Sequence, residues 1–307
     1  MEFGKTEKGL LKEIAGLEKV PLGAYNIREN GKLAGRNTTA NIDIVTKKDK
    51  PGIDIYIKSD TKNERVDIPV ILTETGLNDL VYNDFYVADG ANVTIVAGCG
   101  IHNAGGFKSE HDGIHAFHIG KNAKVLYIEK HYGEGEGTGE RILNPTTLIE
   151  IDEGGSMTME TAQIRGVDSA IRKTDAVLAA NATLVIHEKI MTHGKQYAET
   201  NFHVALNGEN SGAHVVSRSI AKDDSHQKYI SLVDGNNKCS GHTECDAIIM
   251  DNGTVTAKPE LNANNIDASL IHEAAIGKIA GEQLIKLMSL GLTEKEAEEK
   301  IVNGFLK

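Results

Sequence analysis

The sequence predicts an all-β core that folds as a parallel β-helix, followed by a helical domain at the C-terminus. Three observations support this prediction: a two-residue alternation of apolar and polar side chains, a pattern that recurs along the chain, and a change to helical spacing at the end. The alternation runs from Ile53 to about Leu261, and its plainest stretch is IDIYI at 53–57. A period of two is typical of strands, and no segment between these limits keeps the 3.6-residue period of a helix.

A short pattern recurs within this β region. It consists of a turn residue, a small residue and then alternating apolar residues, and it returns at intervals of roughly 27 to 33 residues. Self-similarity at this period is typical of a solenoid, in which each unit buries its apolar face by stacking on its neighbours. A β-sandwich or a propeller is the alternative, but a propeller needs four strands per repeat and an aromatic signature that this chain lacks. The pattern occurs at 89–95, 121–127, 154–159, 180–186 and 211–216.

The two ends of the chain differ from this central region. Apolar residues at helical spacing between Leu10 and Leu17 predict a first helix, and from Ser269 the spacing again becomes helical. Thr293 and Glu296 form the pattern of a capping box, which predicts the start of a final helix. The predicted segments are a helical or irregular N-terminal segment (1–52), the β-helix core (53–268) and a C-terminal helical domain (269–307).

The composition excludes several classes of protein. The 307 residues include 33 basic and 44 acidic side chains, and the formal net charge of −11 argues against nucleic-acid binding, which depends on Lys and Arg neutralising phosphates. No apolar run approaches the ~20 residues of a membrane span, and the N-terminus shows no basic-then-apolar signal segment. We therefore expect a cytoplasmic protein that binds neither nucleic acid nor membrane. Its three cysteines are too few for a disulfide framework and are expected to be free thiols.

The cysteines are the first candidates for chemistry. Cys245 begins an apolar stretch and has a carboxylate and a histidine close in sequence, whereas the spacing between Cys239 and Cys245 is not that of a zinc knuckle. Cys99 lies between Gly98 and Gly100, which suggest a chain corner or a close approach of backbone. Each thiol could instead be an inert buried side chain, and the residues alone leave both interpretations open.

Histidines and carboxylates supply further candidate ligands. The adjacent His272 and Glu273 could bind a metal such as iron, or His272 could be an ordinary surface histidine. On a strand, His111 and His115 would share a face, as metal ligands or as histidines satisfied within the core. The glycine-rich run 133–139 lacks the Gly-Lys-Ser/Thr ending of a phosphate-binding loop, so we expect a flexible loop there.

Several spaced motifs resemble the SufB/SufD family of scaffold proteins. They follow the family's order and cover roughly residues 70–307, whereas the N-terminal region matches no pattern that we can name. The motifs are HTECDAIIM at 242–250, ASLIHEAAIGKI at 268–279, the tail from Leu287 to Phe305, and the segments that begin at Gly98 and at Ala123.

The resemblance implies a right-handed parallel β-helix that acts in the SUF pathway of iron–sulfur cluster assembly, as a scaffold without turnover of its own. It implies that Cys99 takes part in delivering sulfur into the β-helix. It also implies that Cys245, with His272 and Glu273 at a dimer interface, holds the iron and the transient iron–sulfur cluster. Cys239 is extra to the family pattern and is interpreted as an accessory thiol.

The resemblance also implies partners. An ABC-type ATPase, SufC, docks on the C-terminal helices of such proteins, so we expect an ATPase to bind the tail of this chain. The short chain carries both the cysteine usual in SufB and the interface histidine of both branches, which predicts a homodimer, or a pair with a SufB/SufD paralogue, that shares the cluster site. The residues expected to dock the ATPase are Leu284, Leu287, Met288, Leu290 and Leu292.

Two other functions are compatible with the sequence. A carbohydrate-active β-helix enzyme, a lyase or hydrolase, would place carboxylates and basic helpers on one face of the solenoid, and Asp168, Arg165 and Arg172 are the candidates. Aromatic residues make up only 5% of the chain, which leaves few stacking platforms for a sugar. The other alternative is a structural or interaction protein whose thiols are inert.

Overall fold

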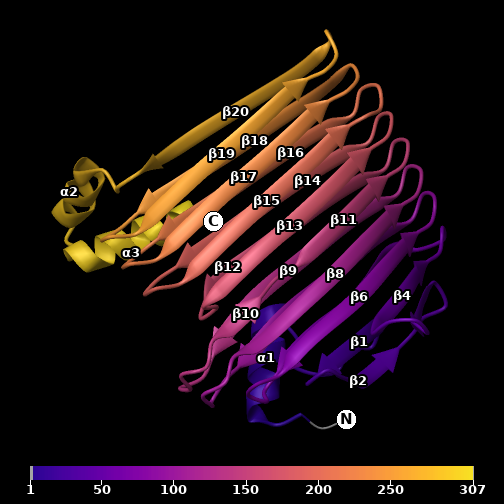
Figure 1. Cartoon of the computed structure of the whole chain (residues 1–307), viewed down its shortest axis with the longest axis horizontal. Helices are drawn as coiled ribbons and strands as arrows, with labels where there is room; N and C mark the ends of the chain where they lie inside the picture. The colour runs from indigo at the N-terminus through magenta and orange to yellow at the C-terminus, as the bar shows by residue number, and fades with distance from the viewer. Residues whose placement is uncertain (1–2, 307) are drawn as a thin grey trace.

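The computed structural model describes residues 3–306, which form two large sheets that face each other around a common core (Figure 1). Through most of the solenoid, the chain alternates between the two sheets, so that strands adjacent in one sheet belong to successive turns. The predicted parallel β-helix is therefore confirmed.

The first sheet extends from the N-terminal to the C-terminal end of the solenoid. Its neighbouring strands are parallel except for the antiparallel pair β1 and β2. In spatial order its strands are β2 (Lys32–Asn37), β1 (Ala24–Glu29), β5 (Lys62–Leu72), β7 (Asn92–His102), β9 (Lys124–Glu134), β12 (Ser156–Arg165), β14 (Thr183–Thr192), β16 (Gly212–Ala221), β18 (Cys239–Ile249) and β20 (Ala268–Gly277).

The second sheet lies opposite the first and is also parallel, apart from the antiparallel pair β3 and β4. Two strands, β10 and β11, occupy consecutive parts of one rung between β8 and β13. In spatial order its strands are β3 (Ile42–Thr46), β4 (Gly52–Ile57), β6 (Asn78–Val87), β8 (Ser109–Ile119), β10 (Arg141–Leu143) with β11 (Thr146–Ile151), β13 (Ser169–Leu178), β15 (Tyr197–Leu206), β17 (His226–Gly235) and β19 (Thr254–Ala263).

The recurring sequence pattern forms the corners where the chain passes from the second sheet to the first. Each corner has a Gly or Asn in the left-handed backbone region, which these two residues adopt more readily than others. The small residue that follows is buried, as Ala91, Ala123 and Ala182 show. The left-handed residues are Gly90, Asn122, Gly154, Asn181 and Asn210, and the backbone N–H of each donates a hydrogen bond to a carbonyl of the next turn.

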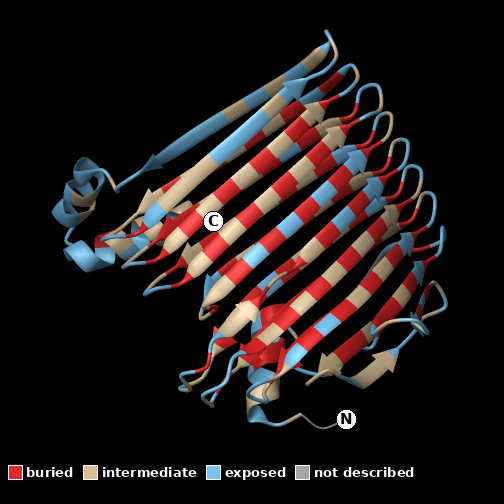
Figure 2. Cartoon of the chain, viewed as in Figure 1, coloured by how far each residue is buried: buried red, intermediate tan, exposed pale blue. Residues whose placement is uncertain are grey.

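The core lies between the sheets and is built from the inward side chains of both. Along the central strands, buried residues alternate with more exposed ones (Figure 2). Phe85 and Phe117 stack within this core with 4.5 Å between ring centroids. Burial of these apolar side chains, turn upon turn, is the main stabilising term of such a fold.

Helix α1 (Lys5–Ala15) packs on the outer face of the first sheet, against β5, β7 and β9. Its buried residues Leu10 and Ile14 lie against the glycines that flank Cys99. A Cβ on Gly98 would lie 2.6 Å from the carbonyl oxygen of Ile14, so the helix could not approach a larger residue as closely. The close backbone approach expected around Cys99 is confirmed.

The C-terminal helices begin later than expected. Residues from Ser269 onward were expected to be helical, but β20 extends to Gly277 and pairs in register with β18. The helical spacing was misleading because Leu270, His272 and Ala274 also fit the two-residue alternation of a strand. The helices are α2 (Gly281–Ser289) and α3 (Glu294–Phe305).

Other local predictions have mixed outcomes. The capping box of Thr293 and Glu296 is present at the start of α3, and α1 confirms the predicted first helix. Strands already begin at Ala24, before the expected start of the solenoid at Ile53. The glycine-rich run 133–139, expected to be a flexible loop, begins within β9, and its Gly137 and Gly139 donate backbone hydrogen bonds to Asn103 and Gly105 on the adjacent turn. Within residues 3–306, none of the helices has the length and hydropathy that a membrane crossing requires.

We expect replacement of Gly166 by alanine to destabilise the fold. Gly166 has a φ of +71°, and a Cβ there would lie 1.8 Å from the carbonyl oxygen of Gly133 on the preceding turn. Left-handed strain alone costs a residue with a Cβ about 1–2 kcal/mol, so we expect the free energy of unfolding to fall by at least about 2 kcal/mol in urea titrations.

The matched control is Gly304→Ala in α3, where a Cβ would meet nothing within 4 Å. This change should leave stability unchanged or raise it by up to about 1 kcal/mol, because alanine favours the helix. Equal unfolding midpoints for the Gly166 variant and the unmodified protein would contradict the assigned close contact.

Candidate functional site

Cys99 points into the interior of the solenoid from β7. Its side chain is 3% exposed, and α1 covers the outer face of the strand at this point. Burial, with Asp79 and Glu129 nearby, raises the pKa of the Cys99 thiol well above its ordinary value. The register partner of Cys99 on β9 is the buried His131. The thiol is therefore protonated at neutral pH and has polar neighbours.

Charged side chains continue from this point into the interior, where apolar residues are the rule. Glu129 forms an ion pair with Arg172, and Nε of Arg172 lies 3.4 Å from a carboxylate oxygen of Glu188. All three side chains are buried. Burial opposes the ionisation of Glu129, but Arg172 and His131 outweigh it and hold the pKa of this carboxyl well below its ordinary value. The interior thus contains a fixed, paired charge.

The polar groups extend to the second candidate thiol. Glu188 accepts hydrogen bonds from the hydroxyls of Thr200 (3.0 Å) and Ser217 (2.7 Å). Ser217 on β16 is the register partner of Cys245 on β18. Together, these side chains connect the surroundings of Cys99 to those of Cys245, and we call them the buried polar chain. Its members are His131, Glu129, Arg172, Glu188, Thr200 and Ser217.

Cys245 also faces inward, and its side chain is 2% exposed. Burial, with Glu188 and Asp246 adding to it, raises the pKa of Cys245 to about 12. Cys239 lies at the start of the same strand and is a free, buried thiol as well. Both cysteines belong to the core cluster, but Cys239 lies six residues before Cys245, beside Ala268 and Gly235, whereas Cys245 lies beside Ser217 of the buried polar chain.

His272 and Glu273 lie on opposite faces of β20. His272 faces inward beside Thr243, whose hydroxyl lies 2.7 Å from Nδ1, and Nε2 is buried without a hydrogen-bond partner among the described residues. Burial lowers the pKa of His272. Glu273 faces outward, with a carboxylate oxygen 3.7 Å from Nε2 of His242. The two neighbours in sequence therefore do not converge on one point within this chain.

The predicted site residues are thus brought together only in part. Cys245 and His272 both face the interior at the C-terminal end of the solenoid. The register partner of Cys245 on β20 is Ala274, which lies two residues beyond His272 on the same face. Cys99 lies several turns away and is connected to them by the buried polar chain. Over residues 3–306, no three His, Cys, Asp or Glu side chains are positioned to hold a metal ion.

The last turn and the C-terminal helices expose apolar side chains. Strands β19 and β20 are the edge strands of their sheets, and much of their surface is exposed (Figure 2). Ile271 is 51% exposed on β20, and Leu290 is 76% exposed after α2. Among the expected docking residues, Met288 is also exposed. Leu284, Leu287 and Leu292 are partly buried.

The buried polar chain is not among the sites predicted from the sequence, although the sequence contains a signal for it. In the stretch VLYIEKHY at 125–132, the alternation places Glu129 and His131 on the same face as the buried Val125 and Tyr127. A charged residue at an inward position of a strand is unusual and marks a buried polar site.

The residues considered for a carbohydrate-active enzyme do not share a face. Arg172 belongs to the buried polar chain, whereas Arg165 and Asp168 line an open cleft of about 830 Å³ at the ends of the strands. Asp168 is paired there with Arg141, whose Nε lies 2.7 Å away. The catalytic grouping of that alternative is therefore not assembled.

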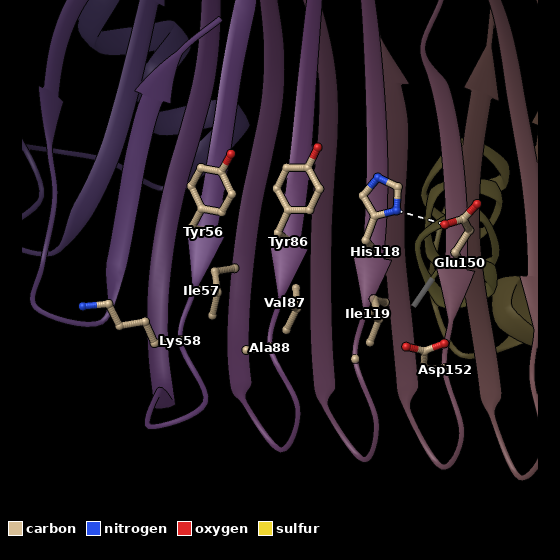
Figure 3. Close-up of a pocket in the computed structure, with 11 residues that line it drawn as sticks. Tyr56, Ile57, Lys58, Tyr86, Val87, Ala88, His118, Ile119, Glu150 and Asp152 are labelled. Carbon is tan, nitrogen blue, oxygen red and sulfur yellow. Dashed lines mark hydrogen bonds and ion pairs between the residues drawn. The ribbon is translucent and has the colours of Figure 1, made fainter.

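A further pocket of about 450 Å³ lies on the outer face of the second sheet (Figure 3). The rings of Tyr56, Tyr86 and His118 stack in a row with 5.0 Å between successive centroids. Nδ1 of His118 lies 2.9 Å from a carboxylate oxygen of Glu150. No cysteine lines this pocket, which is separated from the interior site by the sheet itself.

The chain is similar to known proteins over most of its length. A family model described as "SUF system FeS cluster assembly, SufBD core domain" matches residues 81–305. An iron–sulfur cluster assembly SufBD family protein of Archaeoglobus fulgidus is 30% identical over 263 residues, which are 84% of this chain and 70% of that protein. One of Methanocaldococcus jannaschii is 32% identical over 244 residues, 76% of this chain and 74% of that protein.

A bacterial relative shares a shorter region. The iron–sulfur cluster assembly protein SufB of Bacillus subtilis is 40% identical over 102 residues, which cover 32% of this chain and 22% of that protein. The family model covers well over half of the chain, and the archaeal relatives match across most of their own length. The chain therefore belongs to the SufB/SufD family of iron–sulfur cluster assembly proteins.

Proposed function

We propose that this chain is a scaffold on which an iron–sulfur cluster is assembled from sulfur accepted at Cys99 and iron bound near Cys245. Sulfur passes from the first thiol to the second through the interior of the solenoid. The finished cluster is transient cargo that the scaffold passes on. The observation that carries this proposal is the buried polar chain, which connects the two thiols.

The energetics favour a functional role for these buried charges. Transfer of an ionised group from water to a protein interior costs several kcal/mol, and apolar residues of similar size often stabilise as well or better. Stacked turns of the solenoid need only apolar inward residues, as the phenylalanine stack shows. Polar groups at inward positions instead provide a path that can solvate a sulfide or a sulfane sulfur, which an apolar core would exclude.

The geometry around His272 suits a histidine that binds iron through Nε2. The contact between Thr243 and Nδ1 fixes the ring, and it leaves Nε2 as the free nitrogen. Metal-binding histidines are held in this way through their second nitrogen. Thiolate and imidazole are both suitable ligands for iron, and iron binding would displace the proton that Cys245 carries at neutral pH.

A second copy of the chain would complete the site. The edge strands β19 and β20 present unpaired backbone groups and exposed apolar side chains, a combination that favours pairing with another chain. Glu273 faces outward from β20 and would then serve as a ligand at the interface between two copies. A cluster held by few thiolates from each chain is expected to be labile, which suits its transfer to a recipient.

The C-terminal helices are the proposed docking site for an ABC-type ATPase. Helices α2 and α3 contact each other, and α2 lies beside the end of the edge strand β20 (Figure 1). Their exposed side chains include Ile285, Met288 and Leu290. ATP hydrolysis would take place in the partner, and the scaffold itself would have no catalytic turnover.

We expect the change Cys245→Ser to abolish formation of a stoichiometric cluster. The serine hydroxyl is a poor ligand for iron and cannot accept sulfane sulfur. The measurement is anaerobic reconstitution of the full chain with iron and sulfide, followed by determination of bound iron and the visible absorption spectrum.

The matched control is Cys239→Ser, because this second thiol of β18 is also buried but lies apart from the buried polar chain. It should keep the chromophore. Equal iron binding by the two variants would contradict the assignment of Cys245, and loss in both would show that the variants disturb β18 in general.

We expect deletion of residues 278–307 to abolish ATPase binding while the β-helix remains folded. The deletion starts after the end of β20, so it removes both helices and leaves the strands complete. Binding to a SufC-type ATPase can be measured by calorimetry, and the circular dichroism spectrum reports the fold.

A point variant tests the same surface without truncation. Leu290→Asp should weaken binding strongly, whereas Leu22→Asp, at an even more exposed position before the solenoid, should not. Undiminished binding by the truncated chain would rule out these helices as the docking site.

A further inference from the structure

A small cavity lies next to Cys99 in the interior of the solenoid. Its volume is about 20 Å³, which is room for a single water-sized group. Cys99 lines it from the first sheet, and His111, Gly113 and His115 line it from β8 in the second sheet. Both histidines are buried, as their shared inward face on the strand predicts.

Gly113 keeps this space open. A Cβ at this position would lie 3.3 Å from Nε2 of His111 and 3.3 Å from Nε2 of His115. Gly113 has no positive φ, so its backbone does not demand glycine. The missing side chain is therefore explained by the space between the two imidazoles and Cys99.

The ring of His111 is oriented so that an unpaired nitrogen faces this space. Nδ1 lies 3.1 Å from Asp79, which Arg28 also contacts. Burial opposes the ionisation of Asp79, but His111 and Arg28 outweigh it and lower the pKa of this carboxyl. Asp79 is thus an acceptor and Nδ1 of His111 donates to it, so that Nε2 is the acceptor of the neutral tautomer; this nitrogen faces Gly113 and has no hydrogen-bond partner among the described residues.

His115 is held in the same tautomer. The hydroxyl of Tyr127 donates to Glu129 (2.9 Å), so it accepts from Nδ1 of His115 at 2.7 Å. Nε2 accepts a weak hydrogen bond from Asn83 at 3.3 Å. Burial lowers the pKa of His115 to about 4, so the ring is neutral at pH 7. Both imidazoles therefore present acceptors towards the cavity.

We propose that this cavity holds the outer sulfur of a persulfide formed on Cys99, with Nε2 of His111 as the acceptor for its S–H group. The inference rests on the proposed role of Cys99 as a sulfur acceptor. The cavity has room for one added atom of this kind, and the facing lone pair suits a donor rather than an anion or a second acceptor. Nε2 of His111 lacks a proton donor, and an S–H group supplies one.

The transfer step balances without an added oxidant. The sulfur of Cys99 attacks the outer sulfur of a donor persulfide, R–S–SH. A new S–S bond forms at Cys99, and the S–S bond of the donor breaks. The proton that Cys99 gives up passes by way of His111 to the departing sulfur, which leaves as the thiol R–SH. One sulfane sulfur changes carrier, and there is no net oxidation or reduction.

The test uses the full chain and cysteine persulfide as the sulfur donor under anaerobic conditions. Peptide mass spectrometry after alkylation gives the fraction of Cys99 that carries an extra sulfur, and its decay in the presence of cyanide gives the lifetime. The variant Gly113→Ala fills the cavity while it leaves every polar group in place. We expect the lifetime of the Cys99 persulfide to fall about tenfold or more, the effect of one lost hydrogen bond to a buried group.

Two further variants keep the result interpretable. His111→Asn keeps a donor for Asp79 but removes the acceptor in the cavity, so it should shorten the lifetime in parallel even if Gly113→Ala folds poorly. Gly212→Ala, where a Cβ would make an ordinary 3.4 Å contact with Ser240, should behave as the unmodified protein. Circular dichroism confirms that each variant is folded.

The outcomes separate this inference from the proposed function. If Cys99 is loaded and its persulfide is equally long-lived in both test variants, the cavity has no such role, and sulfur acceptance at Cys99 stands. If the persulfide lifetime falls in Gly113→Ala but not in His111→Asn, the role of the pocket stands and the role of His111 is wrong. If Cys99 of the unmodified protein takes up no sulfur, both the inference and the proposed role of Cys99 are wrong.

Discussion

The in-register hydrogen bonding between stacked turns is the constraint on which the rest of this structure depends. Because the strands are parallel and side chains alternate, each inward residue meets the inward residues one turn before and one turn after it. This places His131 beside Cys99, Ser217 beside Cys245 and Thr243 beside His272. A shift of one residue in any pair would turn these side chains outward and separate the groups.

The same stacking explains how the interior can contain charges. Glu129, Arg172 and Glu188 come from three different strands, and each finds its partner because the turns are held at fixed spacing. Hydrogen bonds from Thr200 and Ser217 satisfy the remaining carboxylate oxygens, which limits the cost of burial. Apolar layers such as Phe85 with Phe117 stabilise the solenoid around this polar region. Some inward positions therefore carry apolar side chains that stabilise the solenoid, and others carry the polar side chains of the proposed sulfur path.

Much of the fold could be predicted from local sequence, because a solenoid repeats a local rule. The alternation, the Gly and Asn corners and the capping box of α3 each have a short-range physical cause. The strand at 268–277 was missed because a short apolar run fits either period, and only its pairing with β18 decides between them. The shared face of His111 and His115 was predictable from alternation. Their convergence on Cys99 was not, because it depends on a contact between the two sheets.

The candidate site shows the same division. The resemblance to a known family drew attention to Cys99, Cys245, His272 and Glu273. The opposite orientations of His272 and Glu273 could not be predicted, because a helix was expected from Ser269 where the structure has the strand β20. The inward position of Arg172 follows the alternation along β13, but its ion pair with Glu129 depends on a contact between the two sheets. Groups that act together here come from strands far apart in sequence, and sequence spacing alone cannot place them.

The most direct test of the account is to follow isotopically labelled sulfane sulfur from Cys99 to Cys245. The full chain is loaded with a labelled persulfide donor, and the label at each cysteine is followed over time by peptide mass spectrometry. We predict that label reaches Cys245 in the unmodified protein and in Glu160→Gln, an outward carboxylate on β12, but not in Cys99→Ser and only slowly in Glu188→Gln. Full labelling of Cys245 in Cys99→Ser would contradict transfer through the interior.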